Sequence, residues 1–270
     1  MKLRSVYLWV LAFVIVAFAA IYQRMTGPTY PVRGSIRIGD SVISFKLTTS
    51  TDAAGDEEVH LKVPDTKISG IVELRRYPSN DPWVRHDLER QGEDLIARIP
   101  HQAPAGKVTY RIQLRGGADS AWITSEPVVI RYKGKVPEFI MVPHIILMFL
   151  AMWFSTRAGF EGLFKRPHVA QQTLWTILAL TLGGMVLGPL VQKLAFGVYW
   201  SGWPIGKDLT DNKTVAAWLV WLIALWRIRK RPDATWWAVA ASVILFLVYM
   251  IPHSVLGSEI DYTKMPPPPM

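Results

Sequence analysis

Two dipeptides and one polar loop contain the residues of this chain that are best suited to hold a ligand. His144 and His253 each follow a proline beside a strongly apolar segment, and Glu259 comes six positions after the second histidine. Asp208 and Asp211 lie in the loop GVYWSGWPIGKDLTDNKT, between two other apolar segments. Imidazole together with carboxylate suits a transition metal, whereas carboxylates alone suit a harder cation. These five residues are the candidate ligand-binding or metal-binding residues, although their spacing matches no known metal motif.

The same residues also suit a haem or a purely structural role. A b-type haem held by His144 and His253 would make the protein a redox subunit. The predicted depths oppose this pairing, because His253 falls at the membrane boundary and His144 lies roughly 9 Å inside a helix that rises 1.5 Å per residue. The structural role of the loop would be helix capping, since Asp211 or Thr210 is a suitable N-cap for the helix that follows. The sequence therefore does not identify a cofactor.

Aromatic and polar side chains in two loops are candidates for contact with a partner protein. Tyr77 and Trp83 flank a loop punctuated by prolines, and Trp203, Lys207 and Asn212 belong to the polar loop that contains the aspartates. Aromatic side chains anchor many protein interfaces. Packing of the tryptophans on the domain surface and snorkelling of the lysine to lipid headgroups are the alternatives.

Long apolar segments predict that the chain crosses a membrane. About 20 residues span the hydrocarbon core of a bilayer. Half of the 270 residues are hydrophobic, and they are concentrated rather than evenly spread. The candidate spans are residues 6–22, 139–156, 173–194, 214–228 and 234–251. Because residues 214–228 alone are too short to cross, we expect that helix to begin near Leu209, which places Asp211 in its first turn.

Basic residues predict the orientation of the spans. Lysine and arginine concentrate in cytoplasmic loops. They cluster before residue 6, between the second and third spans, and between the fourth and fifth spans, which all fall on one side. We therefore expect a bacterial inner-membrane protein with a cytoplasmic N-terminus and an exported β domain, polar loop and tail. The first span is either a retained anchor or a cleavable signal.

Alternating short runs between the first two spans predict a β domain. Antiparallel strands with one buried face alternate apolar and polar residues. Such runs, separated by Gly, Pro and Asp turns, are residues 35–38, 41–47, 59–63, 71–74, 94–99, 108–114 and 128–132. Gly39 and Asp40 form a hairpin turn between the first two. The layout of residues 33–132 resembles an immunoglobulin-like antiparallel β-sandwich, which implies a binding or spacing role, but no specific motif supports it.

These elements give a membrane α+β protein: an anchor or signal over residues 1–23, the β-sandwich, a four-helix transmembrane bundle over residues 138–254 and a Pro-rich exported tail over residues 255–270. Gly184 and Gly188 form a GxxxG pattern that favours close helix packing.

The net charge of +9 lies largely in the cytoplasmic loops, which argues against nucleic-acid binding. The absence of cysteine excludes disulfides and cysteine-ligated metals. No catalytic motif is present, so we expect a non-catalytic binding or assembly subunit of an envelope complex, with a metal-binding or haem-binding redox or enzymatic subunit as the alternative.

Overall fold

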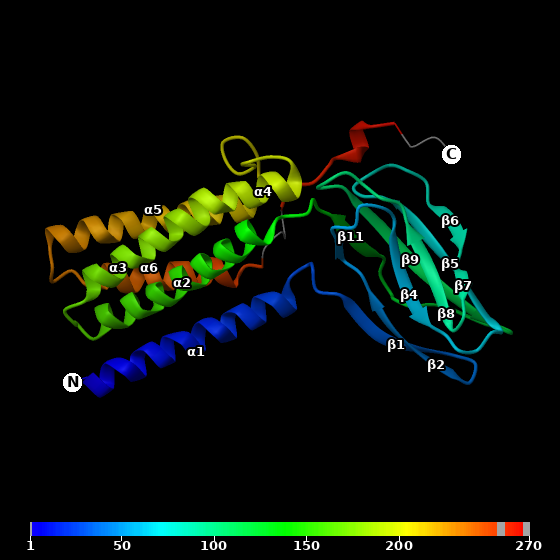
Figure 1. Cartoon of the computed structure of the whole chain (residues 1–270), viewed down its shortest axis with the longest axis horizontal. Coiled ribbons are helices and arrows are strands. Elements are labelled where there is room, and N and C mark those ends of the chain that lie inside the picture. Colours follow the sequence, from blue (N-terminus) through cyan, green and yellow to red (C-terminus); the bar gives the residue numbers. More distant parts are fainter. Residues whose placement is uncertain (1, 253–256, 267–270) are drawn as a thin grey trace. The chain divides into compact units, whose positions relative to one another are not determined.

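The computed structural model describes residues 2–252 and 257–266, with side chains from residue 5 onward (Figure 1). Contacts divide the chain into two units. The helical unit comprises Met1–Pro28 and Val136–Ser258, and the β unit comprises Thr29–Lys135 and Glu259–Met270. The end of the chain thus belongs to the β unit, from which it is separated in sequence by the helices.

The helical unit contains long apolar helices. In chain order its elements are α1 (Lys2–Thr26), α2 (Glu138–Leu163), α3 (Val169–Leu180), the π-helix η1 (Thr181–Leu187), α4 (Gly188–Phe196), α5 (Leu209–Lys230) and α6 (Trp236–Met250). Within the described part of the chain, three helical stretches are long and apolar enough to cross a membrane, namely Ser5–Thr26, Glu138–Leu163 and Val169–Phe196. Together with the β-sheets they fit the predicted membrane α+β protein.

The last two predicted spans differ from the first three. Helix α6 is apolar but has only 15 residues. Helix α5 has 22 residues, and charged side chains lie in both its first and its last turn. It begins at Leu209, as the span-length argument predicts. Its N-cap is Asp208, so the prediction of Asp211 or Thr210 as the cap was wrong; Asp208 is the residue whose side chain accepts from the Thr210 backbone.

Small residues allow the helices of this unit to approach closely. A Cβ atom added at Gly184 would lie 2.8 Å from Thr214 Cγ2 of α5, which shows how tightly η1 and α5 pack, whereas the nearest atom to one added at Gly188 would be 3.6 Å away. Glycines of α2 make equally close contacts: a Cβ at Gly159 would lie 2.6 Å from Ser242 Oγ, and one at Gly162 would lie 2.6 Å from the Thr235 carbonyl oxygen. Helix α2 therefore packs directly against α6 (Figure 1).

Helix α1 packs along α2. The Trp153 indole N–H donates to the Trp9 carbonyl at 3.1 Å, and the two rings meet edge to face with centroids 5.2 Å apart. The small side chains of Ala12, Val16 and Ala19 are fully buried on the same helix. Their period of three to four residues places them on one face, which explains why only one stripe of this otherwise apolar helix is covered.

The β unit has three sheets around one core. Its strands are β1 (Val32–Ile38), β2 (Ser41–Leu47), β3 (Ser50–Thr51), β4 (Glu57–Lys62), β5 (Ile68–Arg76), β6 (Val84–Asp87), β7 (Glu89–Gln91), β8 (Asp94–Ile99), β9 (Lys107–Gly116), β10 (Asp119–Trp122) and β11 (Val128–Tyr132). The sheets are β1-β2, β3-β11-β9-β5-β6 with β10 also paired to β9, and β4-β8-β7. Aliphatic side chains from all three sheets form a single apolar cluster.

All seven predicted strands are confirmed, and four short ones were not predicted. The hairpin is also confirmed, with Ile38 paired to Ser41 and Gly39 at a φ of +57°, where a side chain would be strained. One pairing differs from the antiparallel expectation, because β3 runs parallel to β11. Strand β3 is only two residues long and extends the edge of the sheet beside β11.

Candidate functional site

The loop between α4 and α5, residues 197–208, is held by two buried carboxylates at the start of α5. Asp208 caps the helix: its Oδ1 accepts from the Thr210 backbone N–H at 2.8 Å, and its Oδ2 accepts from the Ser258 N–H at 2.9 Å. Asp211 lies one turn later, so its side chain points back toward the loop. Only 7% of Asp208 and 8% of Asp211 is exposed. Both acids are therefore part of the interior of the loop.

Asp211 of α5 joins the loop and α4 to its own helix through one carboxylate oxygen. Its Oδ2 accepts from the backbone N–H groups of Ser201 and Gly202 at 2.7 and 2.9 Å, and from Gln192 Nε2 of α4 at 3.1 Å. Next to it the Oγ atoms of Ser201 and Ser258 are 2.6 Å apart. We call Gln192, Ser201, Asp208, Asp211 and Ser258 the acid–serine cluster. It connects the end of α4, the loop, the start of α5 and the segment that follows α6.

The acid–serine cluster and the neighbouring Asn212 together fix which side chains the loop exposes. Asn212 Oδ1 accepts from the Trp203 N–H at 2.6 Å. Gly202 has no room for a side chain, because an added Cβ would lie 2.6 Å from Asp211 Cβ. Between these fixed points Trp203 and Ile205 are 76% and 77% exposed, although both are large and apolar. The loop is thus a hydrogen-bonded scaffold that displays two hydrophobic side chains, with Lys207 exposed after them.

The candidate ligand residues do not come together as one described group. The structure brings Asp208 and Asp211 together through Ser201. His144 Nδ1 is 2.9 Å from the Gly183 carbonyl oxygen of η1, and Glu259 is paired with Lys107 of the β unit at 2.5 Å. His253 lies outside the described residues. Among residues 2–252 and 257–266, no three His, Cys, Asp or Glu side chains are close enough to hold a metal ion.

The two aromatic candidates of the β unit have different surroundings. The Trp83 ring packs against the guanidinium groups of Arg75 and Arg111, whose Cζ atoms are 4.7 and 4.9 Å from the ring centroid. Arg111 also lies 4.3 Å from the Trp122 ring, so the side chains form a stack. Tyr77 is more exposed, with Lys107 Nζ 5.9 Å from its ring. Trp83 is thus partly covered, whereas Tyr77 is accessible.

Glu73 lies beside this stack and pairs with Arg111 of the stack and with Arg85. Its two carboxylate oxygens accept from Arg85 Nη2 and Arg111 Nη2, each at 2.6 Å. These hydrogen bonds, the one from Arg85 foremost, lower the pKa of Glu73 below its ordinary value although burial acts in the opposite direction. A carboxyl whose pKa is lower in the folded state stabilises the fold above its ordinary pKa, and this contribution is lost as the pH falls through the folded pKa.

Glu73→Gln should therefore destabilise the β unit at neutral pH and much less at acidic pH. We expect a loss of about 2 kcal/mol at pH 7, typical of hydrogen bonds to a charged group, and a smaller difference below pH 4. Urea unfolding of the full chain in detergent, followed by the β-sheet circular dichroism signal, measures it. The matched control is Glu93→Gln, because Glu93 forms a solvent-exposed pair with Lys62 that should contribute under about 0.5 kcal/mol. Equal losses at pH 7 and pH 3 would refute the assignment.

A buried ion cluster in the helical unit was not predicted from the sequence. Arg157 and Glu161, one turn apart on α2, are paired and only 2% and 0% exposed. Arg166 Nε lies 3.3 Å from the same carboxylate, and Arg157 donates to Ser5 Oγ and lies over the Trp9 ring of α1. Arg157 and Arg166 belong to the basic residues between the second and third predicted spans, which we expect in a cytoplasmic loop. The sequence signal for the pair is its i, i+4 spacing, whereas the contacts of Arg157 with Ser5 and Trp9 of α1 give no sequence signal.

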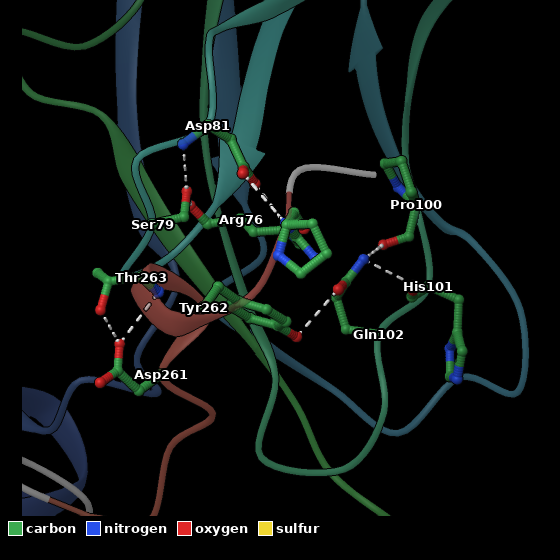
Figure 2. Close-up of polar contacts among 10 residues, drawn as sticks. Arg76, Ser79, Asp81, Pro100, His101, Gln102, Asp261, Tyr262 and Thr263 are labelled. Atoms are coloured by element: carbon green, nitrogen blue, oxygen red, sulfur yellow. Dashed lines mark hydrogen bonds and ion pairs between the residues drawn. The ribbon is translucent and has the colours of Figure 1, made fainter. Parts of the chain in front are cut away.

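The tail of the chain is bound to the β unit (Figure 2). Tyr262 is only 6% exposed, and its hydroxyl donates to Gln102 Oε1 at 3.0 Å. The Arg76 guanidinium lies 4.8 Å from the Tyr262 ring centroid and is itself held by Asp81. The sequence predicted an extended, Pro-rich tail and gave no sign that this tyrosine is buried. Residues 255, 256 and 267–270 of that tail lie outside the described residues.

Comparison of the chain with protein-family models, with curated proteins and with solved structures found no match.

The contacts of the acid–serine cluster indicate what its carboxylates can do. The carboxylates accept hydrogen bonds from backbone N–H groups, hydroxyls and an amide. Lys213, one residue beyond Asn212, donates to the Ile251 carbonyl at 2.6 Å. This arrangement is suited to holding a shape.

Proposed function

We propose that this chain is an integral protein of the bacterial inner membrane that acts as a non-catalytic binding or assembly subunit of an envelope complex. In this proposal α1 is a retained anchor, the β unit is an exported immunoglobulin-like sandwich, and the remaining helices form a four-helix transmembrane domain. The α4–α5 loop then lies on the exported side. The observation that carries the proposal is the display of Trp203 and Ile205 on a loop fixed by buried hydrogen bonds.

The rigidity of the loop supports protein docking over simple anchoring in lipid. Aromatic side chains at a membrane surface need only float at the headgroup level. A protein interface instead gains from side chains that are already in place, because their ordering then costs little on binding. A lipid anchor has no need of a buried carboxylate that accepts hydrogen bonds from both the loop and α4. Exposed Trp and Ile side chains on such a support have the character of binding hot spots.

Substitution of the two displayed side chains tests this function. Membranes of the native host are solubilised gently and separated by native electrophoresis, and the chain is detected by an epitope tag. We expect the wild-type chain to migrate in a larger complex and the Trp203→Ser/Ile205→Ser variant to migrate alone. The control is Phe164→Ser/Trp236→Ser, which removes two exposed aromatic side chains elsewhere in the helical unit. A loop variant that keeps the complex, or a wild-type chain that migrates alone, would contradict the proposal.

A further inference from the structure

The described part of the tail is bound by two separate loops of the β unit. It is irregular up to Asp261 and then forms the short 3-10 helix η2 (Tyr262–Lys264). The backbone N–H of Ile260 donates to the Ala105 carbonyl at 3.2 Å, and that of Tyr262 donates to the Pro78 carbonyl at 3.1 Å. Alternate backbone groups of the tail are thus used, as when a peptide is added to the edge of a domain. Main-chain contacts of this kind set the register of the bound segment and depend little on its sequence.

Tyr262 supplies the sequence-dependent part of the contact. Its hydroxyl takes the place that a side chain of residue 106 would need, since a Cβ added at Gly106 would lie 2.5 Å from that oxygen. Gln102 Oε1 accepts a hydrogen bond from the hydroxyl, and the Arg76 guanidinium lies over the ring (Figure 2). A phenylalanine would lose the hydrogen bond, and a small side chain would leave the space empty. We call Arg76, Pro78, Gln102, Ala105, Gly106 and Lys107 the tyrosine site.

The two ends of the bound segment are fixed by positive charges. Lys107 pairs with Glu259 at 2.5 Å, three residues before the tyrosine. Arg76 Nη2 donates to the Pro266 carbonyl at 2.7 Å, four residues after it. The tyrosine site therefore fits a segment with an acidic residue, a tyrosine three positions later that begins a short 3-10 helix, and a carbonyl acceptor beyond it.

The tyrosine site is also held in place by contacts that do not involve the tail. Arg76 Nε and Nη2 donate to Asp81 at 2.6 and 3.0 Å, and Ser79 Oγ donates to the Arg76 carbonyl (Figure 2). Gln102 Nε2 donates to the carbonyls of Pro100 and His101. By contrast Glu259 and residues 263–266 of the tail are exposed, and Ile260 and Asp261 are half-buried. One buried side chain and a few peripheral bonds are what a competing segment has to replace.

We propose that the tyrosine site is a peptide-recognition site, that residues 259–266 are its resident ligand, and that a partner protein displaces them with an acidic segment that carries a tyrosine at the start of a helical turn. This inference rests on the proposed function, because it assigns the β unit its own partner chemistry. Because the resident tail is covalently attached, it competes with any free peptide at a high effective concentration. If that concentration is about 1 mM, and tail and peptide both bind with a Kd of about 0.1 mM, the tail weakens the apparent affinity for the peptide roughly tenfold.

Peptide binding to the full chain in lipid nanodiscs tests the inference. The probe is a fluorescent peptide with the sequence of residues 259–270, and its anisotropy is measured with the wild-type chain and with Tyr262→Ala, in which the tail lacks its anchor. A chain that ends at Ser258 is the second released form. We expect both released forms to bind the peptide at least tenfold more tightly than the wild type does. A peptide with alanine in place of the tyrosine should not bind.

Gln102→Leu in the released chain separates the tyrosine site from non-specific binding, because it removes the acceptor of the hydroxyl and keeps the size of the side chain. It should weaken the peptide severalfold, with an unchanged β-sheet circular dichroism spectrum. Failure of both released forms to bind, or equal binding of the alanine peptide, would overturn the inference. If wild-type chains associate by exchanging tails, the segment that displaces the resident tail comes from a second copy of this chain. That result would overturn the proposal of a different partner protein. None of these results involves Trp203 or Ile205, so the loop proposal is tested separately.

Discussion

Asp211→Ala should open the α4–α5 loop while leaving the rest of the helical unit folded. The substitution leaves the N–H groups of Ser201 and Gly202 and the amide of Gln192 without their acceptor. A buried polar group that loses its partner costs about 1–3 kcal/mol, so we expect local opening to become easier by about 3 kcal/mol, or roughly 100-fold. Cleavage by endoproteinase Lys-C after Lys207 reports this opening, because proteolysis follows the population of the open form.

Two further variants make the Asp211 experiment specific. Asp211→Asn keeps one side-chain oxygen as an acceptor and should give an intermediate cleavage rate. Asp233→Ala removes an exposed acid from the loop between α5 and α6 and should leave cleavage after Lys207 unchanged. If Asp211→Ala is cleaved no faster than the wild-type chain, the acid–serine cluster does not hold the loop.

Glu161→Ala should have the largest effect on the stability of the helical unit. It leaves Arg157 buried beneath Trp9 with no carboxylate, and Arg166 loses the same partner. Removing one member of a buried ion pair costs about 3–5 kcal/mol, because the remaining charge is not compensated. Stepwise denaturation with sodium dodecyl sulfate, followed by the helical circular dichroism signal, measures this loss.

The double variant Arg157→Met/Glu161→Leu distinguishes an uncompensated charge from lost packing. Apolar residues of similar volume often replace a buried ion pair at little cost, so the double variant should recover most of the stability that Glu161→Ala loses. Glu138→Ala, at the exposed start of the same helix, is the control and should be close to neutral. A double variant that is less stable than Glu161→Ala would show that the ion pair itself, rather than charge balance, stabilises the unit.

Residue patterns that act locally were readable in the sequence. Alternation marked each of the longer strands, and the hairpin followed from Gly39, whose positive φ a side chain would resist. The start of α5 at Leu209 followed from the length that a span requires. Strand β6 could not be found in this way, because all four of its residues are exposed and give no alternation. Its pairing with β5 comes from tertiary structure.

Contacts between distant segments could not be predicted from one sequence. The polar loop as a functional site stays a prediction, and the hydrogen bonds by which Asp211 holds it include one from Gln192 of another helix. Tyr262 is followed by prolines that suggest an exposed tail, yet its burial depends on Gly106 and Gln102, more than 150 residues earlier. Likewise, Arg157 of the i, i+4 pair of α2 lies under Trp9, more than 140 residues earlier in the sequence.

Photocross-linking from position 205 tests the proposed docking role of the α4–α5 loop most directly. A photoreactive amino acid replaces Ile205 in the intact chain, and cells of the native host are irradiated before the membranes are solubilised. We predict one discrete protein adduct that is lost when Asp211→Ala is combined with the probe and that does not form when the probe replaces Phe164. Adducts with lipid alone, or a protein adduct that persists in the Asp211→Ala background, would contradict a docking surface shaped by the acid–serine cluster.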